Sequence, residues 1–239
     1  MQPRGAEHLS DRDAHGDAHG DAQRNASLDY QRFADTPLER TPFDHLIVPG
    51  FLRPRAREAL DAAFPEIGRG GSFPADSLDC GPAFAAFLDE LRGPELTAAV
   101  AAKFGIDLAD RPVMVTLRGQ SRSKDGRIHT DSASKLITAL IYMNPSWDSA
   151  AGRLRLLRGP DDIEDYVAEV PPERGTLLAF RCGPNAYHGH KPYVGQRRSV
   201  QVNWMTDQAV MRRELGRHGL TAWTKRLFGF GAGPGTGTR

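Results

Sequence analysis

Apolar residues in the first half of the chain recur mostly at helical spacing. The short apolar run over 45–48 predicts a first strand. Alanine and leucine then recur at helical intervals over 53–64, which predicts a helix that stops at Pro65. The same spacing predicts two more helices, over 83–91 and 95–104. This half of the chain is therefore expected to supply packing helices.

The pattern changes at Val113 to short runs that are rich in strand-forming residues and separated by turn residues. Seven such runs favour a sandwich or barrel over alternating β-α units. Helices followed by a sheet predict an α+β fold in which helices buttress a β-roll. The expected strands are 113–120, 128–131, 136–143, 153–158, 166–170, 176–180 and 198–205.

Both ends of the chain differ from this central region, which is expected to form one domain over 41–207. Residues 1–40 contain few apolar side chains and a DAHGDAHGDA repeat, which predicts a disordered low-complexity tail. Residues 208–230 predict a basic amphipathic helix, and residues 231–239 a flexible Gly-rich tail. The helix packs against the roll or against a second subunit in a homodimer, or it lies on a membrane surface.

Composition narrows the range of partners and compartments. The 239 residues include 31 basic and 30 acidic side chains, so no overall field favours nucleic acid or an anionic membrane. Two cysteines without CxxC spacing argue against a disulfide framework. Neither a signal peptide nor an apolar run of about 20 residues is present, so a cytoplasmic location is expected.

Residues with metal-binding chemistry occur at two places in the β-rich region. His129 and Asp131 are one residue apart, so in a strand over 128–131 both side chains point to the same face. A third ligand must come from elsewhere, and His188 and His190 are both available. Two imidazoles and one carboxylate leave three open positions in an octahedron. That arrangement suits iron(II), which must bind a chelating co-substrate and dioxygen together.

Two adjacent arginines follow these histidines. An arginine that reaches the metal would bind the far carboxylate of 2-oxoglutarate as a planar, bidentate fork. In a strand over 198–204, Arg198 shares one face with three apolar residues, Val200, Val202 and Trp204. The apolar set is expected to face the interior of the roll, which turns Arg198 inward and Arg197 to solvent. We therefore expect Arg198 to bind the co-substrate.

Residues 113–205 resemble the catalytic roll of the prolyl-4-hydroxylase-like branch of the iron(II)/2-oxoglutarate oxygenase superfamily. In that family, the distal histidine precedes a proline by four residues and the co-substrate arginine by nine or ten, which selects His188 over His190. The matching pieces are His129-Thr130-Asp131, Tyr142-Met143-Asn144, Gly152-Arg153-Leu154, the GTLLAF run over 175–180, and His188 with Pro192 and Arg198.

The resemblance implies a fold and a set of roles. It implies a double-stranded β-helix (jelly-roll) core, with Fe(II) held by the triad His129, Asp131 and His188. It also implies that Tyr142 hydrogen-bonds 2-oxoglutarate alongside Arg198. His190 would then contact the substrate or hydrogen-bond a group at the site.

The implied activity is an iron(II)- and 2-oxoglutarate-dependent dioxygenase. It would hydroxylate an unactivated C–H bond with O2 as co-substrate, release succinate and CO2, and use ascorbate as an auxiliary reductant. The substrate could be a small molecule, a saccharide or a peptidyl side chain. One alternative is a metal-dependent dioxygenase that uses no 2-oxo acid. The other is a non-catalytic jelly-roll module that binds a saccharide or a peptide.

Overall fold

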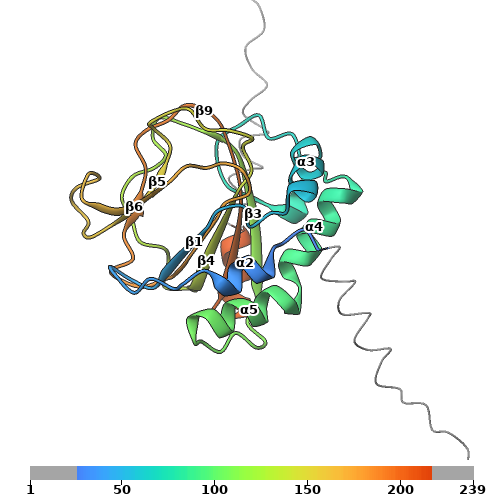
Figure 1. Cartoon of the computed structure of the whole chain (residues 1–239), viewed down its shortest axis with the longest axis horizontal. Helices are drawn as coiled ribbons and strands as arrows, with labels where there is room; N and C mark the ends of the chain where they lie inside the picture. The colour runs from blue at the N-terminus through green and yellow to red at the C-terminus, as the bar shows by residue number, and fades with distance from the viewer. Residues whose placement is uncertain (1–25, 217–239) are drawn as a thin grey trace, which may run out of the picture.

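The computed structural model describes residues 26–216, which fold into helices and two antiparallel sheets (Figure 1). The larger sheet has six strands in the order β1-β7-β4-β9-β3-β2, and the smaller has three in the order β6-β5-β8. The strands are β1 (His45–Val48), β2 (Phe73–Pro74), β3 (Val113–Ser121), β4 (Lys135–Tyr142), β5 (Leu154–Leu157), β6 (Tyr166–Val170), β7 (Leu177–Arg181), β8 (His188–Gly189) and β9 (Gly195–Met205).

Four α-helices come mainly from the first half of the described chain: α2 (Tyr30–Asp35), α3 (Pro54–Ala62), α4 (Pro82–Arg92) and α5 (Pro94–Phe104). The last three each begin with a proline, whose fixed φ and missing N–H suit the first helical turn. Helix α5 ends at Gly105, which adopts the left-handed conformation with φ 57°. The prolines account for the starts of α3, α4 and α5, and Gly105 accounts for the end of α5.

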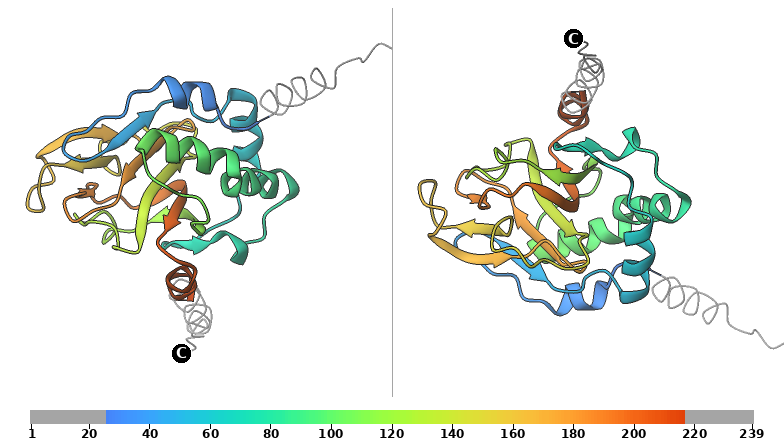
Figure 2. Two further views of the ribbon diagram at one scale, coloured as in Figure 1. Left: turned by 90° about the horizontal axis from the view of Figure 1, so that it is seen from below. Right: turned by 90° about the horizontal axis from the view of Figure 1, so that it is seen from above.

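The six-stranded sheet has one face toward the helices and one toward the smaller sheet, and Figures 1 and 2 show this layered arrangement. We call these the outer face and the inner face. The outer face packs Val200, Val202 and Trp204 of β9 in one hydrophobic cluster with α4 and α5, to which the indole nitrogen of Trp204 adds a 3.1 Å hydrogen bond to Thr97. A second cluster fills part of the space between the sheets and includes Leu178 and Phe180.

The α+β architecture with a jelly-roll core is as the sequence predicts, and strands β1 and β6 have the expected bounds. Two local predictions are wrong. Residues 128–131 form no strand, and only His129 makes a β-bridge there. The predicted disorder over 1–40 does not hold for 26–40, because Leu28 is fully buried and α2 packs Phe33 into the core. Residues 1–25 lie outside the described chain.

The predicted C-terminal helix is only partly within the described residues. Residues 208–216 are helical, whereas the rest of the 208–230 segment and the 231–239 tail lie outside the described part. Among the residues that the structure describes, no helix has both the length and the apolar character needed to cross a membrane.

Candidate metal centre

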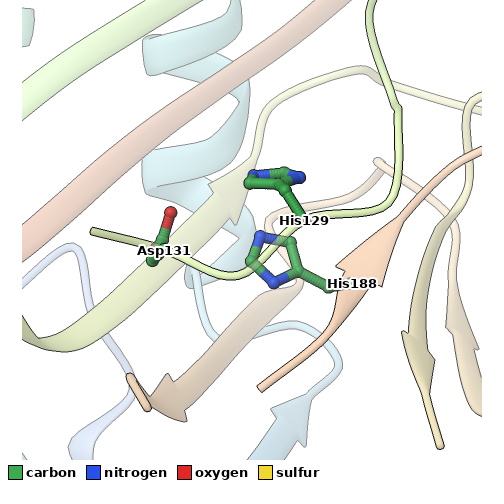
Figure 3. A group of neighbouring side chains, drawn as sticks. All are labelled: His129, Asp131 and His188. Carbon is green, nitrogen blue, oxygen red and sulfur yellow. The ribbon is translucent and has the colours of Figure 1, made fainter. Parts of the chain in front are cut away.

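His129, Asp131 and His188 lie close together in the structure (Figure 3). The two histidines form an antiparallel bridge in which each backbone N–H donates to the other residue's carbonyl at 3.0 Å. Their ring centroids are 4.3 Å apart, and the candidate ligand atoms of all three residues lie within 4.8 Å of one another. The three side chains named from the sequence thus lie together, although the β-bridge brings them together rather than a strand over 128–131.

Backbone carbonyls orient both imidazoles in the same way. Nδ1 of His129 lies 2.9 Å from the carbonyl oxygen of Arg127, and Nδ1 of His188 lies 3.0 Å from that of Ala186. A proton on Nδ1 that donates to the carbonyl leaves the Nε2 lone pair free to bind a metal. Burial lowers the pKa of His188 to about 4, so its ring is neutral at pH 7.

Asp131 is fixed through both of its carboxylate oxygens. The Thr138 hydroxyl donates to Oδ2 at 2.5 Å, and the Lys135 ammonium lies 3.1 Å from Oδ1. The amide of Asn203 in turn donates to the Thr138 hydroxyl at 2.7 Å. Burial opposes ionisation of Asp131, but the Lys135 charge and these hydrogen bonds hold its pKa below the usual value. The triad thus presents an anionic carboxylate beside the imidazoles.

The triad lines a cavity of about 430 Å³. The inner face of β9 lines the same cavity, and every second side chain there is polar. These residues are Arg197, Ser199, Gln201 and Asn203. The inner face of β9 is therefore the polar one, and its apolar residues point to the helices.

The prediction that Arg198 points into the roll is wrong. Its guanidinium pairs with Asp61 of α3 at 2.8 Å and lies 5.1 Å above the ring of Phe64. The prediction assumed that the apolar face of β9 looks into the roll. Because the helices supply a larger apolar layer on the outer side, strand alternation instead turns Arg197 inward.

Arg197 is only 7% exposed and lines the cavity. Its Nε donates to the carbonyl of Gly152 at 2.8 Å. Gly152 has φ 75°, and an added Cβ there would come within 2.7 Å of the Trp147 ring, so glycine is required at this position. Among the described residues, Nη2 of Arg197 is a buried nitrogen with no hydrogen-bond partner.

Tyr142 provides a second buried polar atom without a partner. The described residues offer its hydroxyl no hydrogen bond, and the Arg197 guanidinium lies 5.5 Å from its ring centroid. Burial raises the pKa of Tyr142, so the hydroxyl keeps its proton and can donate. Two unsatisfied donors that lie close together in a buried site fit an anionic acceptor such as a carboxylate.

His190 lines the same cavity but is not part of the triad cluster. Its Nδ1 lies 2.8 Å from the carbonyl oxygen of Lys191, and burial lowers its pKa to about 4. Gly126 has φ 94° and lies so close that a Cβ at that position would collide with the His190 ring. The structure therefore places a neutral imidazole in the cavity wall.

Residues 119–206 match the family model described as the 2OG-Fe(II) oxygenase superfamily. Over these residues the chain is similar to members of that superfamily. The match contains all three residues of the triad as well as Arg197 and Tyr142. No curated protein sequence matches the chain.

Solved structures of two prolyl hydroxylases have a fold similar to that of this chain. A prolyl-4-hydroxylase from Pseudomonas putida is 18% identical with a TM-score of 0.51, and the alignment covers 68% of this chain and 92% of that one. A viral collagen prolyl hydroxylase from Paramecium Bursaria Chlorella virus-1, in complex with 2OG, is 13% identical with a TM-score of 0.50, covering 69% and 96%. At these identities the likeness concerns the fold alone.

Several residues of the candidate site are not predicted from the sequence. Thr138 and Lys135, which fix Asp131, come from β4, and Arg118 reaches the cavity from β3. The polar alternation along β9 was a usable signal for Arg197. A strand with polar residues at every second position and apolar residues between them does not show which face meets the larger apolar layer.

Proposed function

We propose that the protein is an iron(II)- and 2-oxoglutarate-dependent dioxygenase that hydroxylates an unactivated C–H bond and releases succinate and CO2. One observation carries the proposal. A His-x-Asp…His triad and two unsatisfied buried donors, on Arg197 and Tyr142, occur in and beside the same cavity. The first set suits a divalent metal and the second suits the free carboxylate of a 2-oxo acid that chelates this metal.

His129, Asp131 and His188 would hold the iron. Their donor set of two neutral imidazole nitrogens and one carboxylate oxygen suits ferrous iron and leaves three coordination positions open. When bound, the iron and 2-oxoglutarate together activate dioxygen for C–H cleavage. The protein contributes fixed ligands, because the β-bridge, Thr138 and the two backbone carbonyls already hold the three side chains in place.

Arg197 replaces Arg198 as the proposed anchor of the co-substrate. Arg197 lies nine residues after His188, which agrees with the family spacing as well as the tenth residue does. The Nε of Arg197 donates to the carbonyl of Gly152, and this hydrogen bond fixes the orientation of the guanidinium. Nη2 of Arg197 and the hydroxyl of Tyr142 are then two donors without partners among the described residues. Without an anion, this buried cation would lack compensation, which is costly.

The remaining cavity wall positions the substrate and limits the access of water. Apolar side chains of Met114, Leu140 and Leu154 line the cavity among the polar ones. The proposed reaction needs no separate acid–base pair or nucleophile. A small molecule, a saccharide or a peptidyl side chain could enter this cavity.

The direct test is conversion of 2-oxoglutarate to succinate by the purified protein with ferrous iron and ascorbate. We expect basal, uncoupled turnover that requires iron and disappears in Asp131→Ala. The same protein should develop the ferrous 2-oxoglutarate absorption band under anaerobic conditions. If neither turnover nor the band appears, the proposal fails and the non-catalytic binding module becomes the better account.

A further inference from the structure

A second arginine reaches the cavity from the strand next to β9. Arg118 lies on β3 opposite Ser199, and Met114, Thr116 and Arg118 line the cavity at alternate positions. Within the described part of the chain, its guanidinium makes no hydrogen bond or ion pair. Burial, followed by the nearby Arg197 charge, lowers the pKa of Arg118, yet an arginine keeps its charge in a protein. The cavity therefore contains a partly buried cation that has no ion-pair or hydrogen-bond partner among the described residues.

The acidic residues of the cavity are bound to other groups. Asp131 pairs with Lys135, and Asp125 pairs with the guanidinium of Arg122 at 3.0 Å and also accepts the Arg122 backbone N–H. Glu214 accepts a 3.4 Å hydrogen bond from Ser134. None of these three carboxylates forms an ion pair with Arg118. Asp125 and Asp131 are nevertheless near enough for their charges to favour the protonated form of Arg118.

The proposed co-substrate does not occupy Arg118 either. One carboxylate of 2-oxoglutarate would bind the metal and the other would bind Arg197 and Tyr142. A second guanidinium in the same cavity is then available for a second anion. Two exposed cations, Lys124 and Arg127, also line this cavity, so its mouth is basic as well.

We propose that Arg118 binds a carboxylate or phosphate group of the substrate, which makes the substrate a small anionic molecule. This inference rests on the proposed function, because it takes Arg197 to be occupied by 2-oxoglutarate. A guanidinium recognises both anions through the same planar fork of N–H donors. The cavity of about 430 Å³ has the size of a small-molecule site, and a neutral saccharide would leave the partly buried Arg118 charge without an ionic partner.

The test uses the ferrous protein saturated with 2-oxoglutarate under anaerobic conditions, so that Arg197 is occupied. Inorganic phosphate and acetate are titrated separately by calorimetry at constant ionic strength. We expect at least one of them to bind at a single saturable site. Arg118→Gln should weaken this binding by about 10-fold or more, because it removes charge-assisted hydrogen bonds inside a cavity.

Lys124→Gln is the matched control, since it removes an equal charge from an exposed position of the same cavity. It should weaken anion binding by less than about 3-fold, because solvent screens exposed charges. Arg118→Lys, which keeps the charge, should bind the anion more tightly than Arg118→Gln. The thermal midpoint of each variant checks folding, and no residue between 26 and 216 loses a hydrogen-bond partner when the Arg118 guanidinium is removed.

Three results would overturn the assignment of Arg118. These are the absence of saturable anion binding to the wild-type protein, equal binding to Arg118→Gln, and a rise in the 2-oxoglutarate requirement of Arg118→Gln as large as that of Arg197→Gln. The last result would make Arg118 part of the co-substrate site. The absorption band of the wild-type protein is recorded first, and its absence would overturn the proposed function itself, together with the inference that rests on it.

Discussion

Arg197 and Arg198 are neighbours on β9, yet the two side chains belong to different regions of the molecule. Arg198 lies on the outer face, where it pairs with Asp61 and stacks on Phe64 of the helical layer. Arg197 lies on the inner face with an unsatisfied nitrogen beside the triad cavity. The outer face of the sheet therefore carries the packing that stabilises the fold, while the inner face carries unsatisfied polar groups that suit ligands. Changes on the two faces should accordingly affect different measurements.

The largest inner-face effect should come from removal of a metal ligand. His129→Ala is the most suitable variant, because His129 is exposed and its loss leaves no void in a hydrophobic core. We expect iron affinity and succinate formation to fall by more than about 100-fold, since ligand loss should exceed the 10- to 100-fold effect of removing a ligand's supporting residue. Metal analysis after gel filtration measures the first and a coupled assay the second. Full iron occupancy in this variant would remove His129 from the site.

A smaller inner-face effect is expected at Thr138, which holds Asp131. Thr138→Val keeps the shape of the side chain but removes the hydroxyl that donates to Asp131 and accepts from Asn203. Iron affinity should fall by about 10- to 100-fold because the carboxylate loses its orientation. Competition with a chelator measures this change. Thr138→Ser restores the hydroxyl, so wild-type affinity in that variant and not in Thr138→Val would support the role.

On the outer face the expected effect is on stability. Val202→Ala should lower the free energy of unfolding by about 2 kcal/mol, because Val202 is fully buried against the helices and its removal leaves a small cavity. The neighbouring change Gln201→Ala, on the inner face, should lower it by less than about 1 kcal/mol. Urea unfolding gives both values. Full stability of Val202→Ala, or a lower iron affinity of the folded variant, would contradict the assignment of stability to the outer face and ligand binding to the inner face.

The smallest effect on iron is expected at His190, which lines the cavity outside the triad. His190→Ala should change iron affinity by less than about 2-fold, because the three triad residues remain in place. The same chelator competition serves as the measurement. Loss of iron from His190→Ala together with its retention in His188→Ala would reverse the assignment of the third ligand.

Local patterns in the sequence predicted most of the fold. The run over 45–48 and the helical spacing over 83–104 depend on neighbouring residues alone, and the structure has β1, α4 and α5 at these places within about two residues. The segment over 26–40 was misread because its few apolar residues, Leu28 and Phe33, gain their burial from distant parts of the chain. Short elements such as β8 depend on pairing with β5, which no local pattern reveals.

The candidate site could also be predicted only as far as local sequence patterns reach. The spacing of His129, Asp131 and His188 follows a family pattern, and the structure gathers these residues. The choice between Arg197 and Arg198 instead required knowing which face of β9 meets the helices, a tertiary property. Arg118 was also missed, because its significance depends on the absence of a neutralising group among its described neighbours in space.

An anaerobic titration of 2-oxoglutarate into the ferrous protein tests whether Arg197 anchors this co-substrate. The absorption band of the complex is the readout. The wild-type protein and Arg198→Gln should show the band with midpoints that agree within about 2-fold. In Arg197→Gln the midpoint should rise by about 10- to 100-fold, since the distal carboxylate loses a charge-assisted pair. A raised midpoint in Arg198→Gln with a wild-type midpoint in Arg197→Gln would contradict the account.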